Sequence, residues 1–202
     1  MANSTVPFGL FYYDSAVPDD LLRDVVEWFD DSDTQEPLFP VANAQGRSSE
    51  KSRRVLHFGW KYNYSSGSTR ERAEEFPLVI ATLRDLIAEV WSEAPDGFDI
   101  ESLDQCIVNR YLPGQGIGAH IDSESYGGTI VCFTFLGSRE MEFTQGSDTH
   151  RVYTTPGSMY VMIGESRYEW KHQMRPRKSD TVNGRRVSRE TCFSVTFRGV
   201  RK

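Results

Sequence analysis

The sequence predicts a mainly β protein of the α+β class, with two N-terminal helices packed on one face of a C-terminal double-sheet roll. Two observations carry this prediction. Before residue 98, apolar residues recur at helical spacing between polar loops, and after it short β-branched and aromatic runs alternate with Gly, Pro, Asp and Ser. The 202 residues, 38% of them hydrophobic, suffice for one domain over 1–202.

The first helix is expected to begin at Asp19, because acidic residues suit a helix N-terminus and Leu21, Val25 and Phe29 then recur at helical spacing. Residues 31–52 are rich in Pro, Gly, Ser and polar residues, which predicts a loop.

Residues 55–64 read VLHFGWKYNY and predict a single aromatic strand, followed by a turn at 65–68. The second helix is expected over 76–92, where apolar residues again share one helical face, and the Pro-Asp-Gly run at 95–97 ends it.

The remaining chain predicts eight short strands separated by turn residues, a pattern typical of a roll that closes most of its own edges. The predicted strands cover residues 105–111, 118–122, 129–137, 139–144, 151–154, 158–163, 168–172 and 191–198.

Composition excludes several classes of protein. The three cysteines, Cys106, Cys132 and Cys192, lie in apolar runs without CxxC spacing, which predicts buried free thiols in a reducing compartment rather than disulfides or a zinc site. No apolar stretch approaches the length of a membrane span, and the N-terminus lacks the features of a secretory signal. We therefore expect an intracellular protein of the cytoplasm or nucleus, neither secreted nor membrane-bound.

Charge is distributed unevenly along the chain. The net charge of −6 by itself argues against a nucleic-acid partner. However, residues 47–72 hold seven basic and two acidic residues, and residues 171–202 hold ten basic and two acidic. If folding brings these segments together, they form a positive face suited to phosphates; otherwise they are a solvated loop and a solvated terminus.

Three residues, His120, Asp122 and His172, form a candidate metal triad. His120 and Asp122 make an H-x-D triplet, and residues i and i+2 of a strand point to the same face. His172 follows about four predicted strands later, a separation at which strands of a roll can face each other. Two imidazoles and one carboxylate leave open positions on an ion, the arrangement found in non-haem Fe(II) oxygenases.

An H-x-D triplet alone occurs often by chance, and its histidine could equally be a hydrogen-bonded structural residue. The preceding run NRYLPGQGIGA favours the metal, because it places Asn109 and Tyr111 on one face of a polar strand that a Pro-Gly turn connects to the triplet. His57, in an apolar strand, and His150, in a polar stretch, are expected to have ordinary structural roles.

The run NRYLPGQGIGAHID, the later His172 and the closing SVTFR resemble the AlkB family of Fe(II)/2-oxoglutarate dioxygenases over roughly residues 105–200. The resemblance implies a double-stranded β-helix (jelly-roll) fold, Fe(II) on the metal triad, and 2-oxoglutarate and O2 as cosubstrates. In that family the Asn and Tyr of N-x-Y contact the cosubstrate, which implies this role for Asn109 and Tyr111.

One position departs from the family. Its C-terminal strand carries R-x-x-x-x-x-R, whose first Arg pairs with the distal carboxylate of 2-oxoglutarate; here Arg198 matches the second Arg, but Cys192 replaces the first. A buried carboxylate needs a cationic partner. Arg189 could supply it from a bulged or shifted strand, and Arg198 is the alternative. Ser194 falls where the family has a small polar residue near the cosubstrate.

The resemblance also implies a substrate class. Residues 164–180 and 54–59 resemble the dioxygenase domain of enzymes that hydroxylate a modified wobble uridine in tRNA. Hydroxylation of a carbon bonded only to carbon and hydrogen leaves a stable alcohol, whereas a hydroxylated N-methyl group collapses and releases formaldehyde. We therefore expect hydroxylation of a nucleobase, with tRNA or other RNA favoured over DNA and N-demethylation as the alternative. Partner proteins would supply RNA binding or methyl transfer.

Aromatic residues before the roll predict a stacking lid for an extruded base. This lid would consist of Trp60, Tyr62 and Tyr64, which lie at every second position within the basic segment 47–72. The alternative is that some of these side chains pack on the core. On this interpretation residues 1–97 form helices and a nucleotide-recognition lid, and residues 98–202 form the catalytic core.

Basic residues directly after the last triad member are expected to rim the pocket and contact phosphates: Arg175, Arg177 and Lys178. The alternative for them is solvated surface charge.

Two other function classes stay open. A protein or lipid hydroxylase could use the same scaffold, because fold does not fix substrate. A non-catalytic binding module is conceivable because of Cys192, although the intact metal triad argues against it.

Overall fold

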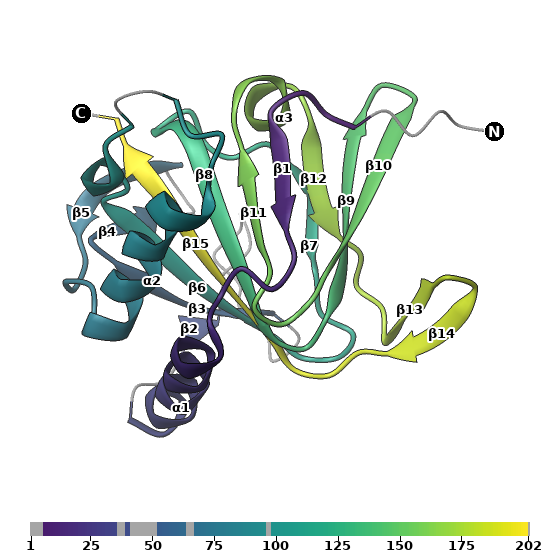
Figure 1. Ribbon diagram of the computed structural model, residues 1–202, viewed down its shortest axis with the longest axis horizontal. Coiled ribbons are helices and arrows are strands. Elements are labelled where there is room, and N and C mark those ends of the chain that lie inside the picture. Colours follow the sequence, from purple (N-terminus) through teal and green to yellow (C-terminus); the bar gives the residue numbers. More distant parts are fainter. Residues whose placement is uncertain (1–5, 36–38, 41–51, 64–66, 96–97, 202) are drawn as a thin grey trace.

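The structure is a computed structural model, and it describes residues 6–35, 39–40, 52–63, 67–95 and 98–201. Antiparallel strands dominate it (Figure 1). Its strands are β1 (Leu10–Tyr13), β2 (Phe39–Pro40), β3 (Arg54–Phe58), β4 (Trp60–Asn63), β5 (Ser68–Arg72), β6 (Gln105–Tyr111), β7 (Ile117–His120), β8 (Tyr126–Leu136), β9 (Arg139–Gln145), β10 (Asp148–Thr154), β11 (Met159–Met162), β12 (Lys171–Met174), β13 (Ser179–Val182), β14 (Arg185–Ser188) and β15 (Cys192–Val200). Its helices are α1 (Asp19–Gln35), α2 (Leu78–Val90), α3 (Gly164–Tyr168) and the 3₁₀ helix η1 (Ile100–Ser102).

Two antiparallel sheets form the roll. The larger has the order β1-β11-β8-β15-β6-β3-β2, and the smaller has the order β10-β9-β12-β7. Strands distant in sequence pair directly, as β15 does with both β6 and β8. The predicted mainly β, α+β architecture with a jelly-roll core is confirmed.

Alternation along β15 explains the layers. Phe193, Val195 and Phe197 belong to the apolar core shared with the helices, whereas Cys192 and Ser194 line a cavity between the sheets. Successive residues of a strand face opposite sides, so alternate side chains of β15 pack against the helices on one face and line the cavity on the other.

Helices α1 and α2 cover the outer face of the larger sheet (Figure 1). Phe29 of α1 stacks on Phe193 with ring centroids 4.1 Å apart, and Ile80, Leu83 and Ile87 of α2 are fully buried. Burying each such side chain contributes roughly 1.5–3 kcal/mol, so the packing of the helices stabilises the sheet that forms one wall of the cavity.

The expected strand over 55–64 is two strands, β3 and β4. Gly59 separates them with a φ of +71°, and a Cβ there would lie 2.0 Å from the carbonyl oxygen of Asp104. Glycine is the residue that accepts such a conformation and such a close approach. The break turns β4 away from the large sheet into a hairpin with β5.

Other boundaries also differ from expectation. Helix α1 continues to Gln35 instead of ending near residue 31, and α3 occupies part of the region that precedes β12. Residues 168–172 were expected to form one strand, but β12 begins only at Lys171. Strand β1 and the β13–β14 hairpin were not expected.

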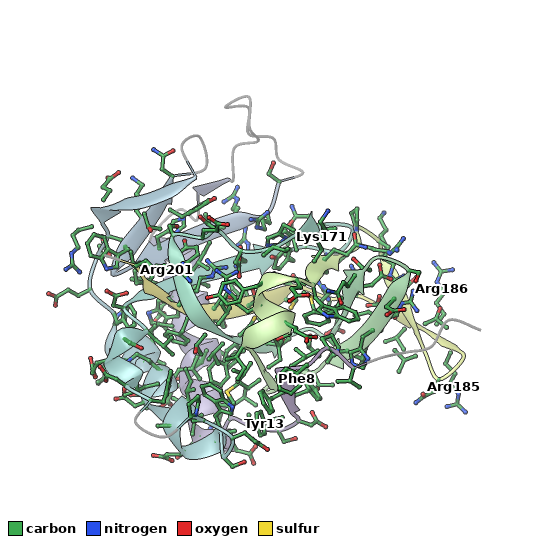
Figure 2. The ribbon with its side chains drawn as sticks, turned by 90° about the horizontal axis from the view of Figure 1, so that it is seen from above. Phe8, Tyr13, Lys171, Arg185, Arg186 and Arg201 are labelled. Atoms are coloured by element: carbon green, nitrogen blue, oxygen red, sulfur yellow. The ribbon has the colours of Figure 1, made fainter. Side chains whose placement is uncertain are left out.

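The β13–β14 hairpin projects from the body of the molecule (Figure 1), and Figure 2 shows Arg185 and Arg186 at its outer end. Within the described residues, none of the helices is both long and apolar enough to cross a membrane.

Candidate metal and cosubstrate site

The metal triad converges at one place between the sheets. His172 of β12 is the cross-strand partner of His120, the last residue of β7, and their ring centroids are 4.3 Å apart. Asp122 lies just beyond β7, with Oδ1 3.7 Å from His120 Nε2. One potential ligand atom from each residue lies within 4.8 Å of the others, so all three can reach a single ion.

Hydrogen bonding orients the first imidazole. His120 Nδ1 lies 2.8 Å from the carbonyl oxygen of Gly118. A carbonyl can only accept, so Nδ1 donates and Nε2 keeps its lone pair for a metal. Metal-binding histidines are commonly held this way.

The electrostatics favour a metal-ready protonation state. Burial lowers the pKa of His172 to about 3 and also lowers the pKa of His120, so both imidazoles are neutral at neutral pH. Burial alone would raise the pKa of Asp122, but the positive charge of Arg198, with a smaller effect from Arg167, holds it below its usual value. The triad therefore presents two neutral nitrogens and a carboxylate, the forms that bind metal.

The hydrogen bonding of the Asp122 carboxylate shows whether the triad suits a bound metal ion. Asp122 Oδ1 accepts from Arg198 Nη2 at 3.2 Å, whereas Oδ2 is buried without a hydrogen-bond partner among the described residues. A buried carboxylate oxygen without a donor is costly, and a cation removes that cost. The residues present thus fit Fe(II).

A residue that the sequence reasoning missed fixes the loop carrying Asp122. The buried Arg167 guanidinium donates to the carbonyl oxygens of Asp122 at 3.1 Å, Ser123 at 2.8 Å and Gly127 at 3.1 Å. With a fourth, longer bond to the carbonyl oxygen of Tyr126 at 3.5 Å, one rigid group holds the start and end of the loop between β7 and β8.

The expected cosubstrate residues surround a cavity of about 410 Å³ beside the triad. Those that line it are Asn109, Tyr111, Ser194 and Arg198. Asn109 Nδ2 donates to Ser194 Oγ at 3.2 Å, and Arg53 Nε donates to Asn109 Oδ1 at 2.9 Å. These groups give the cavity polar walls suited to a small oxo acid. Arg53 was missed; its place in the basic segment just before β3 was the available signal.

Arg189 lies outside the cavity, contrary to the expectation that it could pair with the distal carboxylate of 2-oxoglutarate. Its buried guanidinium donates to both carboxylate oxygens of Asp180 at 2.8 Å and to the carbonyl oxygen of Arg175 at 2.7 Å. Arg189 does not line the cavity, whereas Cys192 does. The strand is neither bulged nor shifted at this point, because Cys192 pairs in register with Tyr111.

The aromatic residues expected to form a lid have different surroundings. Tyr62 lines the cavity and lies 5.9 Å from Tyr126, ring centroid to centroid. Trp60 does not line it: Nε1 donates to Asp104 Oδ2 at 3.0 Å, and the Arg72 guanidinium lies 3.9 Å from its ring centroid. Tyr64 lies outside the described residues.

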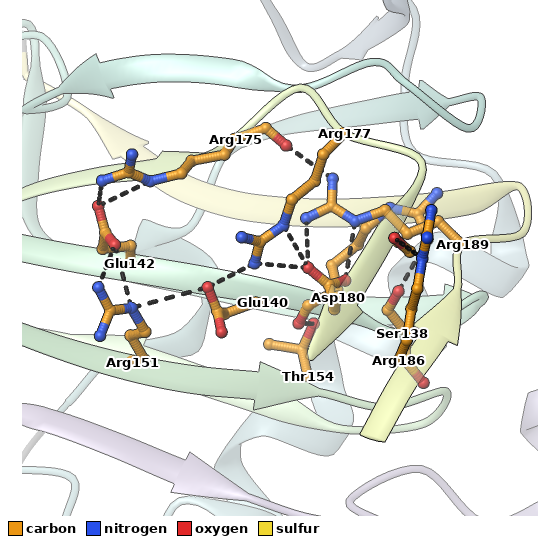
Figure 3. Close-up of polar contacts among 12 residues, drawn as sticks. Ser138, Glu140, Glu142, Arg151, Thr154, Arg175, Arg177, Asp180, Arg186 and Arg189 are labelled. Carbon is orange, nitrogen blue, oxygen red and sulfur yellow. Dashed lines mark hydrogen bonds and ion pairs between the residues drawn. The ribbon is translucent and has the colours of Figure 1, made fainter. Parts of the chain in front are cut away.

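The basic residues after His172 do not rim the cavity. Arg175 pairs with Glu142 at 2.6 Å, and Arg177 pairs with Glu140 at 2.6 Å and Asp180 at 2.7 Å (Figure 3). Both glutamates alternate along β9 with inward-facing residues, so they belong to the outer face of the smaller sheet.

Lys178 is exposed and does not line the cavity. The expectation of a basic rim therefore fails for Arg175 and Arg177, because acidic partners brought by β9 neutralise them.

Comparison with known proteins agrees with this geometry. A family model described as "2OG-Fe(II) oxygenase superfamily" matches residues 16–198. An uncharacterized protein, L905, of Acanthamoeba polyphaga mimivirus is 41% identical over 103 residues, covering 49% of each chain. The tRNA (carboxymethyluridine(34)-5-O)-methyltransferase ALKBH8 of Macaca fascicularis is 34% identical over 182 residues, which cover 88% of this chain and 26% of that one.

The chain thus spans about half of the first relative and a quarter of the second. A solved structure titled "The structure of OsALKBH1" superposes with a TM-score of 0.66 at 17% identity, covering 98% of this chain and 100% of that one, which supports the fold. Together with the converging triad, these matches place the protein: the chain belongs to the 2OG-Fe(II) oxygenase superfamily and is an AlkB-like member of it.

Proposed function

We propose that this protein hydroxylates a modified uridine at the wobble position of tRNA, using Fe(II), 2-oxoglutarate and O2. The observation that carries the proposal is a single cavity that contains the metal triad, polar groups for a cosubstrate and an aromatic wall. Its volume of about 410 Å³ lies within the usual range for small-ligand sites, roughly 300–1,000 Å³.

Each part of the cavity has a task in this proposal. His120, Asp122 and His172 would hold Fe(II), which when bound with 2-oxoglutarate and O2 supplies the oxidation of a C–H bond to an alcohol, with succinate and CO2 as the other products. Asn109 and Ser194 would orient the cosubstrate.

Tyr62 would stack on an extruded base and exclude water. Stacking of this kind contributes roughly 1–3 kcal/mol per base. The neighbouring Tyr126 and Arg53 also line the cavity, so a base entering here would meet both an aromatic face and a cation suited to its phosphate or to an acidic substituent.

The choice of tRNA rests on the methyltransferase relative, whose printed name refers to carboxymethyluridine at position 34. This chain spans only a quarter of that relative. In this proposal, partner proteins supply further RNA contacts and any later methyl transfer. Lys178, exposed next to β13, would be an additional phosphate contact.

The test is a reaction with Fe(II), ascorbate and 2-oxoglutarate on two substrates: tRNA carrying a 5-carboxymethyl-type wobble uridine, and N-methylated RNA or DNA oligonucleotides. Mass spectrometry should show a gain of one oxygen on the wobble uridine and matching succinate. Formaldehyde release from the methylated oligonucleotides alone would replace this proposal with N-demethylation.

Two variants sharpen the experiment. Tyr62→Phe keeps the aromatic face and should retain most activity, whereas Tyr62→Ala should raise the KM for tRNA roughly tenfold. Succinate formed only with a peptide or lipid substrate would instead identify a protein or lipid hydroxylase. Absence of succinate with every substrate would indicate a binding module.

A further inference from the structure

A buried cation, Arg139, lies behind the cavity wall: it does not itself line the cavity, but it binds the carbonyl oxygen of Tyr111, the strand partner of Cys192, where the family's arginine is missing. Arg139 is 0% exposed. Its guanidinium donates to the carbonyl oxygens of Ser138 at 2.7 Å, Tyr111 at 3.3 Å and Glu190. Among the described residues it forms no ion pair with a carboxylate, and its Nε is buried without a hydrogen-bond partner.

This isolation is costly. Burial lowers the pKa of Arg139, because a charged group loses stabilisation when it leaves water. Buried guanidinium groups are normally paired with an anion, and Arg can bind a carboxylate through two parallel hydrogen bonds. The hydrogen-bond partners of Arg139 are three carbonyl dipoles, and the Asp180 carboxylate, which acts on it only through space, is already paired with Arg189.

The position of Arg139 directs it toward the interior of the roll. It lies two residues before Met141 on β9, so both side chains are on the same face, and Met141 lines the cavity. Its partner on β10 is Thr154, which also lines the cavity. Tyr111, whose carbonyl oxygen it binds, is a third cavity residue.

Cys192, the residue that replaces the family's first arginine, is close to Arg139. Cys192 lines the cavity and pairs in register with Tyr111. Burial raises the pKa of its thiol to about 12, and the Arg139 guanidinium is close enough to offset part of that rise. A cation therefore lies beside the position from which the family's first arginine would extend.

Other cations near the cavity already have partners: Arg53, which lines it, donates to Asn109 Oδ1 at 2.9 Å. Arg189 is paired with Asp180. Arg198 donates to the metal-binding carboxylate of Asp122, six residues and roughly 20 Å along the strand from Cys192. We propose that Arg139, on β9, replaces the missing arginine of β15 and binds the distal carboxylate of 2-oxoglutarate.

The proposal rests on membership of the oxygenase family and not on which base is oxidised. Its test therefore needs no nucleic acid and no turnover. Isothermal titration with Mn(II) in place of Fe(II) would measure the affinity for 2-oxoglutarate and for 2-oxopentanoate, a five-carbon oxo acid that lacks the distal carboxylate.

Arg139→Met should weaken 2-oxoglutarate binding about 100-fold and leave 2-oxopentanoate binding nearly unchanged, because only the former has the carboxylate. Adding Cys192→Arg to that variant should restore much of the lost affinity, because the new guanidinium would enter from β15, where the family has its arginine. Arg189→Met is the matched control: it also removes a buried arginine, but should lower stability and leave the ratio of the two affinities unchanged.

Equal losses for both oxo acids in Arg139→Met would mean that Arg139 only supports the fold, and would overturn the proposal. A changed ratio in Arg189→Met would assign the carboxylate to that residue instead. If Arg139→Met does not fold, the wild-type structure with 2-oxoglutarate bound decides: a distal carboxylate within hydrogen-bond distance of Arg139 supports the proposal, and one paired with another cation refutes it.

Discussion

His172 lies directly opposite His120 in the β7–β12 pair, with their imidazole centroids 4.3 Å apart and their rings inclined by 51°. A shift of one residue in this register would turn one imidazole to the other face of the sheet. The metal site is therefore a property of strand pairing, and whatever disturbs the pairing of β7 with β12 should disturb metal binding.

Two glycines beside this pair give a matched test. A Cβ on Gly116 would lie 2.1 Å from the carbonyl oxygen of Met174 and 2.9 Å from Pro176 N, whereas a Cβ on Gly118 would meet nothing within 4 Å. Gly116→Ala should lower the free energy of unfolding by roughly 2–3 kcal/mol and weaken metal binding, because backbone at the end of β12 must move.

Gly118→Ala should change the free energy of unfolding by less than about 0.5 kcal/mol. Urea denaturation would measure both variants. Equal effects of the two substitutions would show that the close approach of β12 at Gly116 does not constrain the site.

The loop that carries Asp122 gives a second prediction. Arg167→Met removes four hydrogen bonds to carbonyl oxygens of the loop and the start of β8. Loss of such support typically costs 10- to 100-fold in metal affinity, and we expect a loss of about that size in a Mn(II) titration. Arg201→Met, which removes an exposed arginine near Tyr168, is the control and should bind metal like the wild type. Unchanged affinity in Arg167→Met would mean that other contacts hold the loop.

Local patterns predicted much of this fold. Strand β6 coincides with the expected residues 105–111, and the triad was predicted because an i, i+2 pair and a later histidine are readable from spacing alone. In contrast, β1 pairs with β11, whose residues lie far along the chain, and no local pattern encodes such a pairing.

Charge partners were the least predictable feature. Arg175, Arg177 and Arg189 are basic in sequence, but their role depends on Glu140, Glu142 and Asp180, which the fold brings to them (Figure 3). The sequence shows which residues are charged, whereas tertiary packing decides which of them are paired with an opposite charge. The same reason hid Arg139, whose proposed role appears only once β9 of the smaller sheet and β15 of the larger sheet are placed around the cavity.

The buried pair of Asp180 and Arg189 should contribute strongly to stability. Both side chains are 1% exposed, and Asp180 also accepts from Arg177 Nε at 2.7 Å. Asp180→Asn leaves the buried Arg189 without a charged partner, while Arg177 keeps Glu140, and should lower the free energy of unfolding by about 3–5 kcal/mol. Glu71→Gln, which breaks the exposed pair with Lys61, is the control and should cost less than about 1 kcal/mol.

The pH dependence of this contribution has a defined sign. Burial alone would raise the pKa of Asp180, but hydrogen bonds from Arg189 and Arg177 hold it below its usual value. A carboxyl with a lowered pKa in the folded state stabilises fully above its unfolded pKa of about 3.9 and loses that stabilisation as pH falls through the folded value. The difference between wild type and Asp180→Asn should therefore be constant near neutral pH and shrink below about pH 4. A difference that grows in acid would contradict this assignment.

The central claim is that His120, Asp122 and His172 hold one iron. Anaerobic titration of Fe(II) into the wild type and the three single alanine variants tests it most directly, with His150→Ala as the control, because His150 lies outside the triad. We predict one Fe(II) per chain in the wild type and in His150→Ala, and affinity lower by more than about 100-fold in each triad variant. A triad variant that binds Fe(II) as tightly as the wild type would contradict the account.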